Sequence, residues 1–293
     1  MRVRDLSLAL LTVAIWGSNF VVMKLGLRGL PPLLFCAMRF GFAAFPVVLL
    51  VRHPKLPWQR VAAWGMAQFA VQFGFLLTGL KLGMAAGLSS IVMQLQAFFT
   101  IGLAWAVLRE KARPVQLLGA AVALAGMGVV ALNLQQRTTL IGLLLLIAGA
   151  VSWAVANVLA RRIGPVNAVA LASWASLYAC VPLLLMSLVF EGAGTDLQAL
   201  RGMDANSWLV VAFQAYPATL FGFGVWSVLM RRYPAAQIAP FTLLVPISGM
   251  ICATLVLHEP LQGWKLLAGA MVVSGLALNQ IPSLHHRLLA RRA

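Results

Sequence analysis

Acidic residues are scarce in this chain of 293 residues: Asp and Glu together number 6, against 22 Lys and Arg. Charged residues of both signs make up only 10% of the chain, and 62% of it is hydrophobic. Soluble domains carry about 25% charged residues, so an ordinary soluble composition is excluded. No Asp or Glu lies in the middle of an apolar run. This absence excludes an acidic proton relay inside a membrane and disfavours a carboxylate sodium site.

The residue groups that carry catalysis or bind metals are also missing. Cys36, Cys180 and Cys252 are odd in number and lie in apolar runs without paired spacing, so we expect small buried side chains. No histidine lies within an apolar run to activate a serine, and His258-Glu259 lacks the second histidine of a metalloprotease helix. No segment has the pattern of an ATP-binding loop. We therefore expect neither an enzyme nor a bound metal or cofactor, and any pumping has to be secondary.

Ten apolar stretches of about twenty residues fill almost all of the chain. A hydrocarbon core about 30 Å thick needs roughly 20 apolar residues of helix, because each residue rises about 1.5 Å. We therefore predict an all-α polytopic membrane protein, embedded in a lipid bilayer, with ten transmembrane helices. The expected spans are 6–27, 32–51, 61–80, 86–108, 114–133, 139–160, 168–190, 207–230, 234–257 and 262–281.

The basic residues fall mostly into alternate gaps between these stretches. Fifteen lie in the gaps on the side of both termini, and the opposite gaps hold Arg28, Lys81, Arg137, Arg201 and Lys265. Under the positive-inside rule this bias places both termini in the cytoplasm. We interpret the formal charge of +16 as a topology signal and expect no nucleic-acid partner, because no soluble segment is long enough to fold. No feature of the sequence indicates an oligomeric state.

The second half of the chain repeats features of the first half. Two short matches are Met84-Ala85-Ala86 with Pro234-Ala235-Ala236, and Trp16 and Lys24 with Trp153 and Arg161 at the same interval of eight. At intervals of nine and seven, Glu110, Gly119 and Gly126 match Glu259, Ala268 and Gly275. We predict two five-helix repeats, residues 1–137 and 138–293. Because five is odd, the second repeat is inverted, and inverted repeats bind solutes at their interface near the midplane.

Uncharged polar and aromatic residues recur at helical spacing within the spans. Amides in hydrocarbon are costly unless they pair or line a cavity, so we expect these faces to point inward. The alternative is that such residues hydrogen-bond the helices together. A pocket that mixes amides with aromatics suits a small amphipathic solute rather than a bare ion. The residues that we expect to contact substrate are Trp16, Asn19, Gln68, Gln72, Gln94, Gln96, Trp153, Asn157, Gln214 and Tyr216.

Three further residues are candidates for charge recognition or gating. Lys24 lies near the outer end of the first span, where its amine can reach the interface by snorkelling. Arg39 lies deeper, about two helical turns below the outer end of the second span. Either cation can neutralise a substrate carboxylate. Pro246, near the middle of the ninth span, is expected to kink that helix and is the candidate hinge.

Several motifs together resemble those of one transporter family over essentially the whole chain. They are Trp16-Gly17-Ser18-Asn19-Phe20, the stretch 31–40 from Pro-Pro to Arg-Phe, 87–101 from Gly-Leu-Ser-Ser to Phe-Phe-Thr-Ile, 110–126 and 239–246. The chain resembles the EamA family of the drug/metabolite transporter superfamily. The resemblance implies two inverted five-helix repeats around a central cavity in a bacterial inner membrane. It also implies export of cysteine-pathway amino acids such as O-acetylserine and cysteine.

We therefore predict a secondary transporter that exports small amino acids and cysteine-pathway metabolites by alternating access. One alternative stays open within transport, the export of aromatic amino acids or cationic amphipathic drugs, because Trp and Phe are plentiful and acids within the spans are few. An alternative from another class is a non-transporting membrane assembly or interaction protein.

Overall fold

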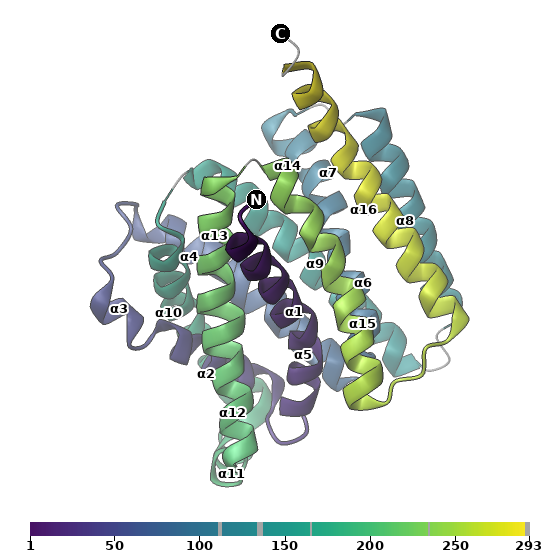
Figure 1. Ribbon diagram of the computed structural model, residues 1–293. Helices are drawn as coiled ribbons and strands as arrows, with labels where there is room; N and C mark the ends of the chain where they lie inside the picture. Colours follow the sequence, from purple (N-terminus) through teal and green to yellow (C-terminus); the bar gives the residue numbers. More distant parts are fainter. Residues whose placement is uncertain (111–112, 134–136, 165, 234, 291–293) are drawn as a thin grey trace.

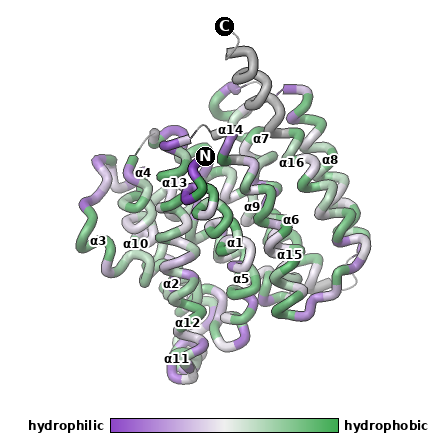
Figure 2. The backbone as a smooth tube through the Cα atoms, viewed as in Figure 1, coloured by the Kyte–Doolittle hydropathy of each residue, from purple (hydrophilic) through white to green (hydrophobic). Residues whose placement is uncertain are grey.

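The computed structural model describes residues 1–110, 113–133, 137–164, 166–233 and 235–290. Every regular element in these ranges is helical, and helices of membrane length run side by side between two faces of the molecule (Figure 1). The first helix begins and the last helix ends at the same face, which we call the terminal face; the other is the opposite face. Hydrophobic residues dominate the helices between these faces (Figure 2).

The first half of the chain forms five spans, several of them built from more than one helical segment. In chain order the segments are α1 (Val3–Gly26), α2 (Pro32–Ala44), α3 (Val47–Leu50), α4 (Trp58–Gly65), η1 (Met66–Val71), α5 (Gln72–Lys81), α6 (Ala86–Val92), η2 (Met93–Leu95), α7 (Gln96–Leu108) and α8 (Pro114–Leu132).

The second half forms another five spans with a similar subdivision. Its segments are α9 (Arg137–Ile163), α10 (Ala168–Ser187), η3 (Leu188–Gly192), α11 (Ala193–Arg201), α12 (Ala205–Phe213), η4 (Gln214–Phe221), α13 (Gly222–Arg232), α14 (Ala235–Ile238), η5 (Ala239–Leu243), α15 (Leu244–Leu257) and α16 (Gly263–Ala290).

Ten apolar helices confirm the predicted fold class. Within the described residues, nine are long and apolar enough to cross a membrane, and the tenth contributes a shorter apolar stretch, Gly263–Leu278. The seventh span is longer than predicted, since it continues to Arg201 instead of ending at residue 190. Both acids of this extension have polar partners: Ser187 Oγ donates to Glu191 and to Asp196 Oδ2, and Glu191 also accepts the N–H groups of Leu33 and Leu34 at the start of α2. The second oxygen of Asp196, Oδ1, is buried without a hydrogen bond.

The two repeats end their fourth spans with the same turn. Arg109 and His258 both adopt left-handed backbone conformations, with φ of 56° and 53°. The N–H groups of the next residues, Glu110 and Glu259, each donate 3.3 Å to a carbonyl six residues earlier. Both glutamates therefore leave their helices in the same way, one at each face. The boundary between the two repeats, expected between residues 137 and 138, stays a prediction. Residues 134–136, just before it, lie outside the described residues.

The fifth spans of the two repeats, α8 and α16, cross each other closely (Figure 1). A Cβ added to Gly119 would lie 2.6 Å from the carbonyl oxygen of Gly275, and one added to Gly275 would lie 2.4 Å from that of Gly119. In the same interface, a Cβ added to Gly126 would lie 3.2 Å from the carbonyl oxygen of Ala268. Residues that match by repeat thus pair crosswise, as a two-fold relation between antiparallel helices requires.

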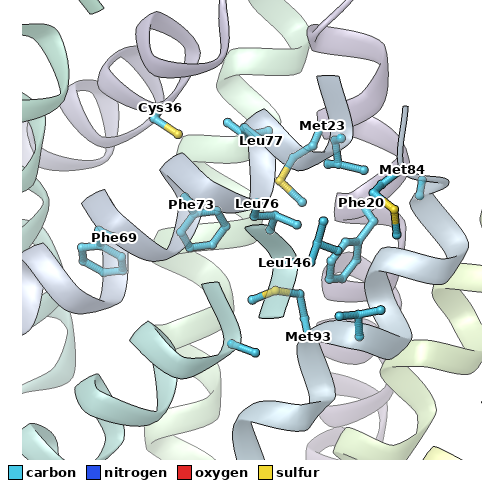
Figure 3. Packing of buried hydrophobic residues seen from close by; sticks show 14 of the residues in the cluster. Phe20, Met23, Cys36, Phe69, Phe73, Leu76, Leu77, Met84, Met93 and Leu146 are labelled. Carbon is cyan, nitrogen blue, oxygen red and sulfur yellow. The ribbon is translucent and has the colours of Figure 1, made fainter. Parts of the chain in front are cut away.

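The buried apolar core holds the other spans together near the midplane. Phe69, Phe73 and Leu76 from the third span belong to the same buried cluster as Phe20 and Met23 from α1 (Figure 3). Cys36 is fully buried in this core as expected, whereas Cys180 and Cys252 are only partly buried.

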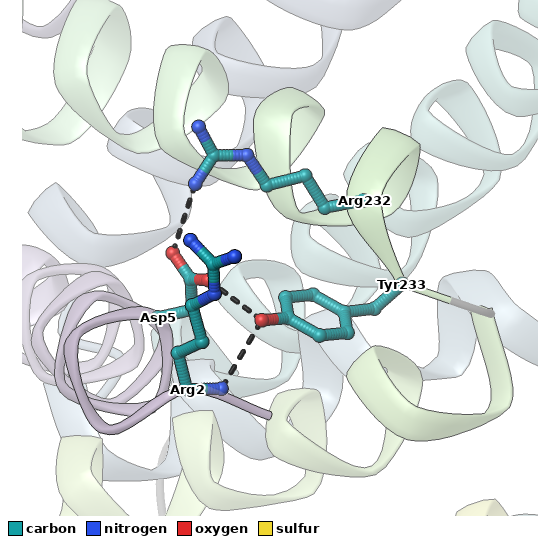
Figure 4. Close-up of polar contacts among 4 residues, drawn as sticks. All are labelled: Arg2, Asp5, Arg232 and Tyr233. Carbon is teal, nitrogen blue, oxygen red and sulfur yellow. Dashed lines mark hydrogen bonds and ion pairs between the residues drawn. The ribbon is translucent and has the colours of Figure 1, made fainter.

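Polar contacts fasten the elements at both faces. At the terminal face the buried Asp5 accepts from Tyr233 Oη at 2.6 Å and from Arg232 Nη1 at 3.2 Å, which ties α1 to the end of α13 (Figure 4). At the opposite face Asp204 caps α12, because its carboxylate accepts from the hydroxyl and the N–H of Ser207 at 2.7 and 2.8 Å. These hydrogen bonds hold the pKa of Asp204 below its usual range.

Candidate functional site

A cavity of about 340 Å³ lies in the middle of the bundle, between the two repeats. This volume is at the lower end of the range of small-ligand pockets, roughly 300 to 1,000 Å³. Its lining combines amides, aromatic rings and one cation: Trp16, Asn19, Phe20, Met23, Arg39, Trp64, Gln68, Gln72, Phe73, Leu76, Met93, Gln94, Gln96, Trp153, Asn157, Ala160, Ala218, Phe223, Trp226, Thr242 and Val245.

The cavity brings together most of the residues singled out from the sequence. Trp16, Asn19, Gln68, Gln72, Gln94, Gln96, Trp153 and Asn157 all line it, and so does Arg39. These side chains come from α1, α2, η1, α5, η2, α7 and α9, so both repeats contribute. Trp16 and Trp153, which match by repeat, both reach the cavity wall.

Four expected residues lie elsewhere. Tyr216 is 40% exposed and does not line the cavity, and Gln214 is buried behind the wall, where its Nε2 donates to the Asn19 carbonyl at 3.4 Å. Lys24 lines a separate pocket at the opposite face. Pro246 is buried in the first turn of α15 and does not line the cavity. Gln214 and Tyr216 are two residues apart, about 200° around an α-helix, so one face of a helix does not hold both side chains. Both lie in the π-helix Gln214–Phe221, which we did not predict from the sequence.

Irregular helices surround the cavity in repeat-related pairs. The third and eighth spans carry the π-helices η1 and η4, and the fourth and ninth carry the 3₁₀ segments η2 and η5. π-helical turns free carbonyl groups from the α-helical pattern, and the freed groups accept from side chains. Trp16 Nε1 donates to Ala218 O at 3.0 Å, and Ser152 Oγ donates to Ala67 O at 2.8 Å. The irregular segments thereby anchor side chains of the neighbouring helices.

Amide side chains form two short networks on the wall. Asn157 Nδ2 donates to Gln96 Oε1 at 2.7 Å and to Thr100 Oγ1 at 3.1 Å, which joins α9 to α7. Gln68 Nε2 donates to Gln72 Oε1 at 3.1 Å within the third span. Asn157 and Gln96 therefore do both things that we considered for the amides: they hydrogen-bond two helices together and they line the cavity.

Aromatic rings cover one part of the wall. The Trp16 ring lies 5.2 Å from Trp226 and 5.9 Å from Phe223, measured between centroids. Trp64, Phe73, Phe223 and Trp226 were not among the expected substrate contacts. Trp64, Phe73 and Phe223 lie in runs of apolar residues, where nothing in the spacing separates a cavity ring from a core ring. The indole N–H gives the Trp226 ring a polar edge, and this edge was the available signal in the sequence.

Among the described residues, Arg39 is the one charged side chain on the cavity wall, and it is 2% exposed. Its Nε and Nη2 both donate to Thr219 Oγ1, at 3.2 and 3.1 Å. The guanidinium carbon lies 4.0 Å from the centroid of Phe73 and 5.1 Å from that of Phe40. Aromatic faces stabilise a cation but bring no negative charge. Within the described residues, His, Cys, Asp and Glu form no group of three able to hold a metal ion.

A membrane-embedded helical bundle with a central cavity of this size and polarity defines a transporter of small solutes. The comparison with known sequences gives its family: the chain belongs to the EamA-like transporter family, whose sequence model matches residues 4–132 and 140–280. The chain is 40% identical over 286 residues to a protein of Salmonella typhimurium named as a probable amino-acid metabolite efflux pump, with 95% of both chains covered. A protein of Escherichia coli K12 with the same name is 37% identical over the same length and coverage.

A solved structure supports the fold. It superposes with a TM-score of 0.65 and covers 100% of this chain and 99% of its own, at 20% sequence identity. That likeness extends to the arrangement of the helices alone.

Proposed function

We propose that this protein is a secondary exporter of small amino acids and related metabolites, including O-acetylserine and cysteine. The observation that carries the proposal is the composition of the central cavity. Its wall offers amide donors and acceptors, aromatic rings and one buried guanidinium in about 340 Å³. An amino acid presents matching groups in a small volume: a carboxylate, an ammonium group and a short side chain.

The names of the relatives support the direction and the class of solute. Both relatives named as probable amino-acid metabolite efflux pumps align with 95% of this chain. We extend export from the cytoplasm of a bacterium to this chain, with alternating access between the two repeats around the cavity. In the proposed orientation both termini lie in the cytoplasm, and Pro246 at the start of α15 is the proposed hinge.

A second candidate solute class is the aromatic amino acids. The cluster of Trp16, Trp226 and Phe223 favours it, because aromatic rings stack or meet edge to face at such distances. Cationic amphipathic drugs suit the cavity less well, since Arg39 would repel a second positive charge in a buried site.

Release of radiolabelled O-acetylserine, cysteine and tryptophan from loaded cells tests the proposal. We expect cells that express the protein to release the small amino acids faster than cells with an empty vector. Gln96→Leu removes an amide from the cavity wall and from its bond with Asn157, so export should fall several-fold.

Gln59→Leu is the matched control, because Gln59 is exposed at the terminal face and away from the cavity. Export equal to that of the empty vector across the common amino acids would refute the proposed function. Faster export of tryptophan than of O-acetylserine would select the aromatic class. The same cells under imposed proton and sodium gradients identify the coupling ion.

A further inference from the structure

Arg39 has no acidic partner in the part of the chain that the structure describes. The ion pairs among the described residues join Arg161 to Glu110 and Arg232 to Asp5, both at the terminal face. A guanidinium has five N–H donors in a planar fork. Two of the nitrogens share the Thr219 hydroxyl, and Nη1 has only the weak acceptor Met23 Sδ at 4.0 Å. A buried cation with this donor excess is compensated best by a carboxylate from outside the chain.

Asn19 has an unused acceptor, whereas Arg39 has unused donors. Its Oδ1 is buried and accepts no hydrogen bond, although the side chain lines the same cavity. An unpaired buried amide oxygen is costly in a membrane interior, so it is retained where a ligand supplies the donor.

One chain of contacts connects Asn19 to Arg39. Gln214 Nε2 donates to the Asn19 carbonyl at 3.4 Å, and Thr219 Oγ1 donates to the Gln214 carbonyl at 2.8 Å. Thr219 in turn accepts from Arg39. The π-helix η4 therefore contacts both the main chain of α1 at Asn19 and the guanidinium of Arg39 on α2.

We infer that Arg39 binds the carboxylate of the solute and Asn19 its ammonium group, so that the site selects zwitterionic α-amino acids. This inference rests on the proposed function and specifies its substrate class. Arg39 matches a carboxylate with two parallel hydrogen bonds, which a lysine ammonium does not reproduce. A solute without a carboxylate leaves the guanidinium unpaired, and such losses discriminate more strongly than a missing apolar group.

Competition by analogues of O-acetylserine tests the inference on the unmodified protein. In proteoliposomes that transport labelled O-acetylserine, we expect the free acid to compete at least about tenfold better than its carboxamide. A des-amino analogue should also compete poorly, because it offers no donor to Asn19. Equal competition by acid and carboxamide, in vesicles that do transport the amino acid, would overturn the role of Arg39 and leave the proposed function intact. Absence of amino-acid transport would instead refute the proposed function.

Two substitutions of Arg39 add a second readout. Arg39→Gln should abolish the preference for acid over carboxamide, and Arg39→Lys should retain only part of it. Arg28→Gln removes a positive charge from an exposed residue at the opposite face and should leave the preference unchanged. Thermal stabilisation of each purified variant by O-acetylserine reports binding separately from transport. An unchanged preference in the Arg39→Gln variant would overturn the inference.

A second, independent observation concerns Glu259 and Glu110, which match by repeat. At the opposite face the Glu259 carboxylate accepts from the N–H groups of Ala86 and Gly87 at 2.7 and 3.2 Å, which joins the end of α15 to the start of α6. At the terminal face Glu110 pairs with Arg161, and its side chain is 52% exposed. Equivalent carboxylates thus have different partners at the two faces.

The basic residues near the two glutamates, Lys24 and Arg161, also have different partners at the two faces. Lys24 matches Arg161 by repeat, and its Nζ donates to the carbonyls of Leu80 and Met84, so it belongs to the closed contact at the opposite face. Beneath Glu259, Ser90 Oγ donates to Pro246 O at 3.3 Å, and Gly87 packs near Met250 and Ala253. On α7, by contrast, a Cβ added to Gly102 would meet nothing within 4 Å.

We propose that Glu259 and Glu110 are alternating latches, each of which caps the first turn of the other repeat's fourth span when its own face is closed. The structure is the state in which the opposite face is latched. In the other state, the repeat relation assigns the Glu110 carboxylate to the N–H groups of residues 236 and 237, with Glu259 released to Lys24. Capping of free N–H groups by a carboxylate is strong enough to bias such an equilibrium.

Labelling of a buried cysteine measures the latch. Ser90→Cys is introduced after the three native cysteines are changed to alanine, and the protein is placed in lipid nanodiscs, where a maleimide reaches both faces. Ser90 is fully buried between α6 and α15, so we expect slow labelling. Glu259→Ala should raise the labelling rate about tenfold, because the latched state loses its cap. Glu110→Ala should not raise it.

Glu191→Ala is the matched control, because Glu191 also caps a helix start, that of α2, with its carboxylate. An equal labelling rate with and without Glu259, or an equal rise in the Glu191→Ala variant, would overturn the latch. Glu259→Gln keeps one acceptor oxygen and should give an intermediate rate, which separates release of the latch from general loss of folding.

Discussion

Asn157 shows at the scale of one residue how a cavity amide also holds two helices together. Its Nδ2 is shared between Gln96 and Thr100 on α7. Asn157→Leu leaves Gln96 Oε1 without this donor, and interhelical hydrogen bonds in membranes contribute about 1 kcal/mol. We expect the free energy of unfolding to fall by about that amount, measured by SDS-induced unfolding in mixed micelles.

Asn133→Leu is the comparison for this substitution. Asn133 is exposed at the end of α8, and its amide donates only to Val129 one turn earlier. Its loss should change stability little. A larger effect at Asn133 than at Asn157 would contradict the assignment of the bridge.

The polar cavity residues were predictable from the sequence because amides and a guanidinium within apolar spans have to be hidden from lipid. That argument predicts that Asn19, Gln72 and Arg39 point inward, and all three line the cavity, but it does not give their partners. Tyr216 lies two residues after Gln214, about 200° around an α-helix, so one face does not hold both side chains. The π-helix Gln214–Phe221 was not predicted, because no local sequence pattern announces it. The apolar residues of the cavity wall, such as Phe73 and Phe223, cannot be told from core residues by their sequence pattern.

At the scale of elements, the crossing of α8 and α16 depends on two glycines. Gly275→Ala places a Cβ 2.4 Å from the carbonyl oxygen of Gly119, and a backbone atom cannot rotate away. Overpacking of this kind costs about 1 to 3 kcal/mol. We expect a lower unfolding midpoint in detergent and a wider separation of the two helices, measured between spin labels on their lipid-facing sides.

Gly128→Ala, on the partner helix α8, tests the specificity of that effect. A Cβ added to Gly128 meets nothing within 4 Å, so the substitution should be neutral or stabilising by up to about 1 kcal/mol through helix propensity. Equal destabilisation by the two substitutions would show that glycine matters to α8 and α16 for a reason other than close approach.

Apolar length placed eight of the ten spans to within a few residues at both ends, because the thickness of the bilayer sets the length of a span. The last helix, α16, continues to Ala290 instead of ending at residue 281. The seventh span ran on to Arg201. Its extension depends on contacts of Glu191 and Asp196 that join distant parts of the chain. The π and 3₁₀ segments could not be predicted from the sequence either. They are stabilised by tertiary contacts, such as the hydrogen bond from Trp16 Nε1 to Ala218 O, rather than by helix propensity.

At the scale of the whole molecule, the arrangement of the helices is confirmed but its orientation in the membrane is still a prediction. The family match and the ten apolar helices do not distinguish which face meets the cytoplasm. The uneven distribution of Lys and Arg does, because basic loops are retained on the cytoplasmic side during insertion. The direction of export and the assignment of the latches to particular compartments both follow from this orientation.

Two neutral, exposed residues at opposite faces test it without disturbing the charge balance. Gln59 lies in the first turn of the third span at the terminal face, and Asn206 lies at the start of the eighth span at the opposite face. In a background without native cysteines, Asn206→Cys should react with a membrane-impermeant maleimide in intact cells whose outer membrane has been permeabilised. Gln59→Cys should react only after the inner membrane is opened as well. The reverse labelling pattern would place both termini outside the cytoplasm and would reverse the proposed direction of transport. Reaction of both cysteines while the inner membrane is closed would require two orientations in one membrane.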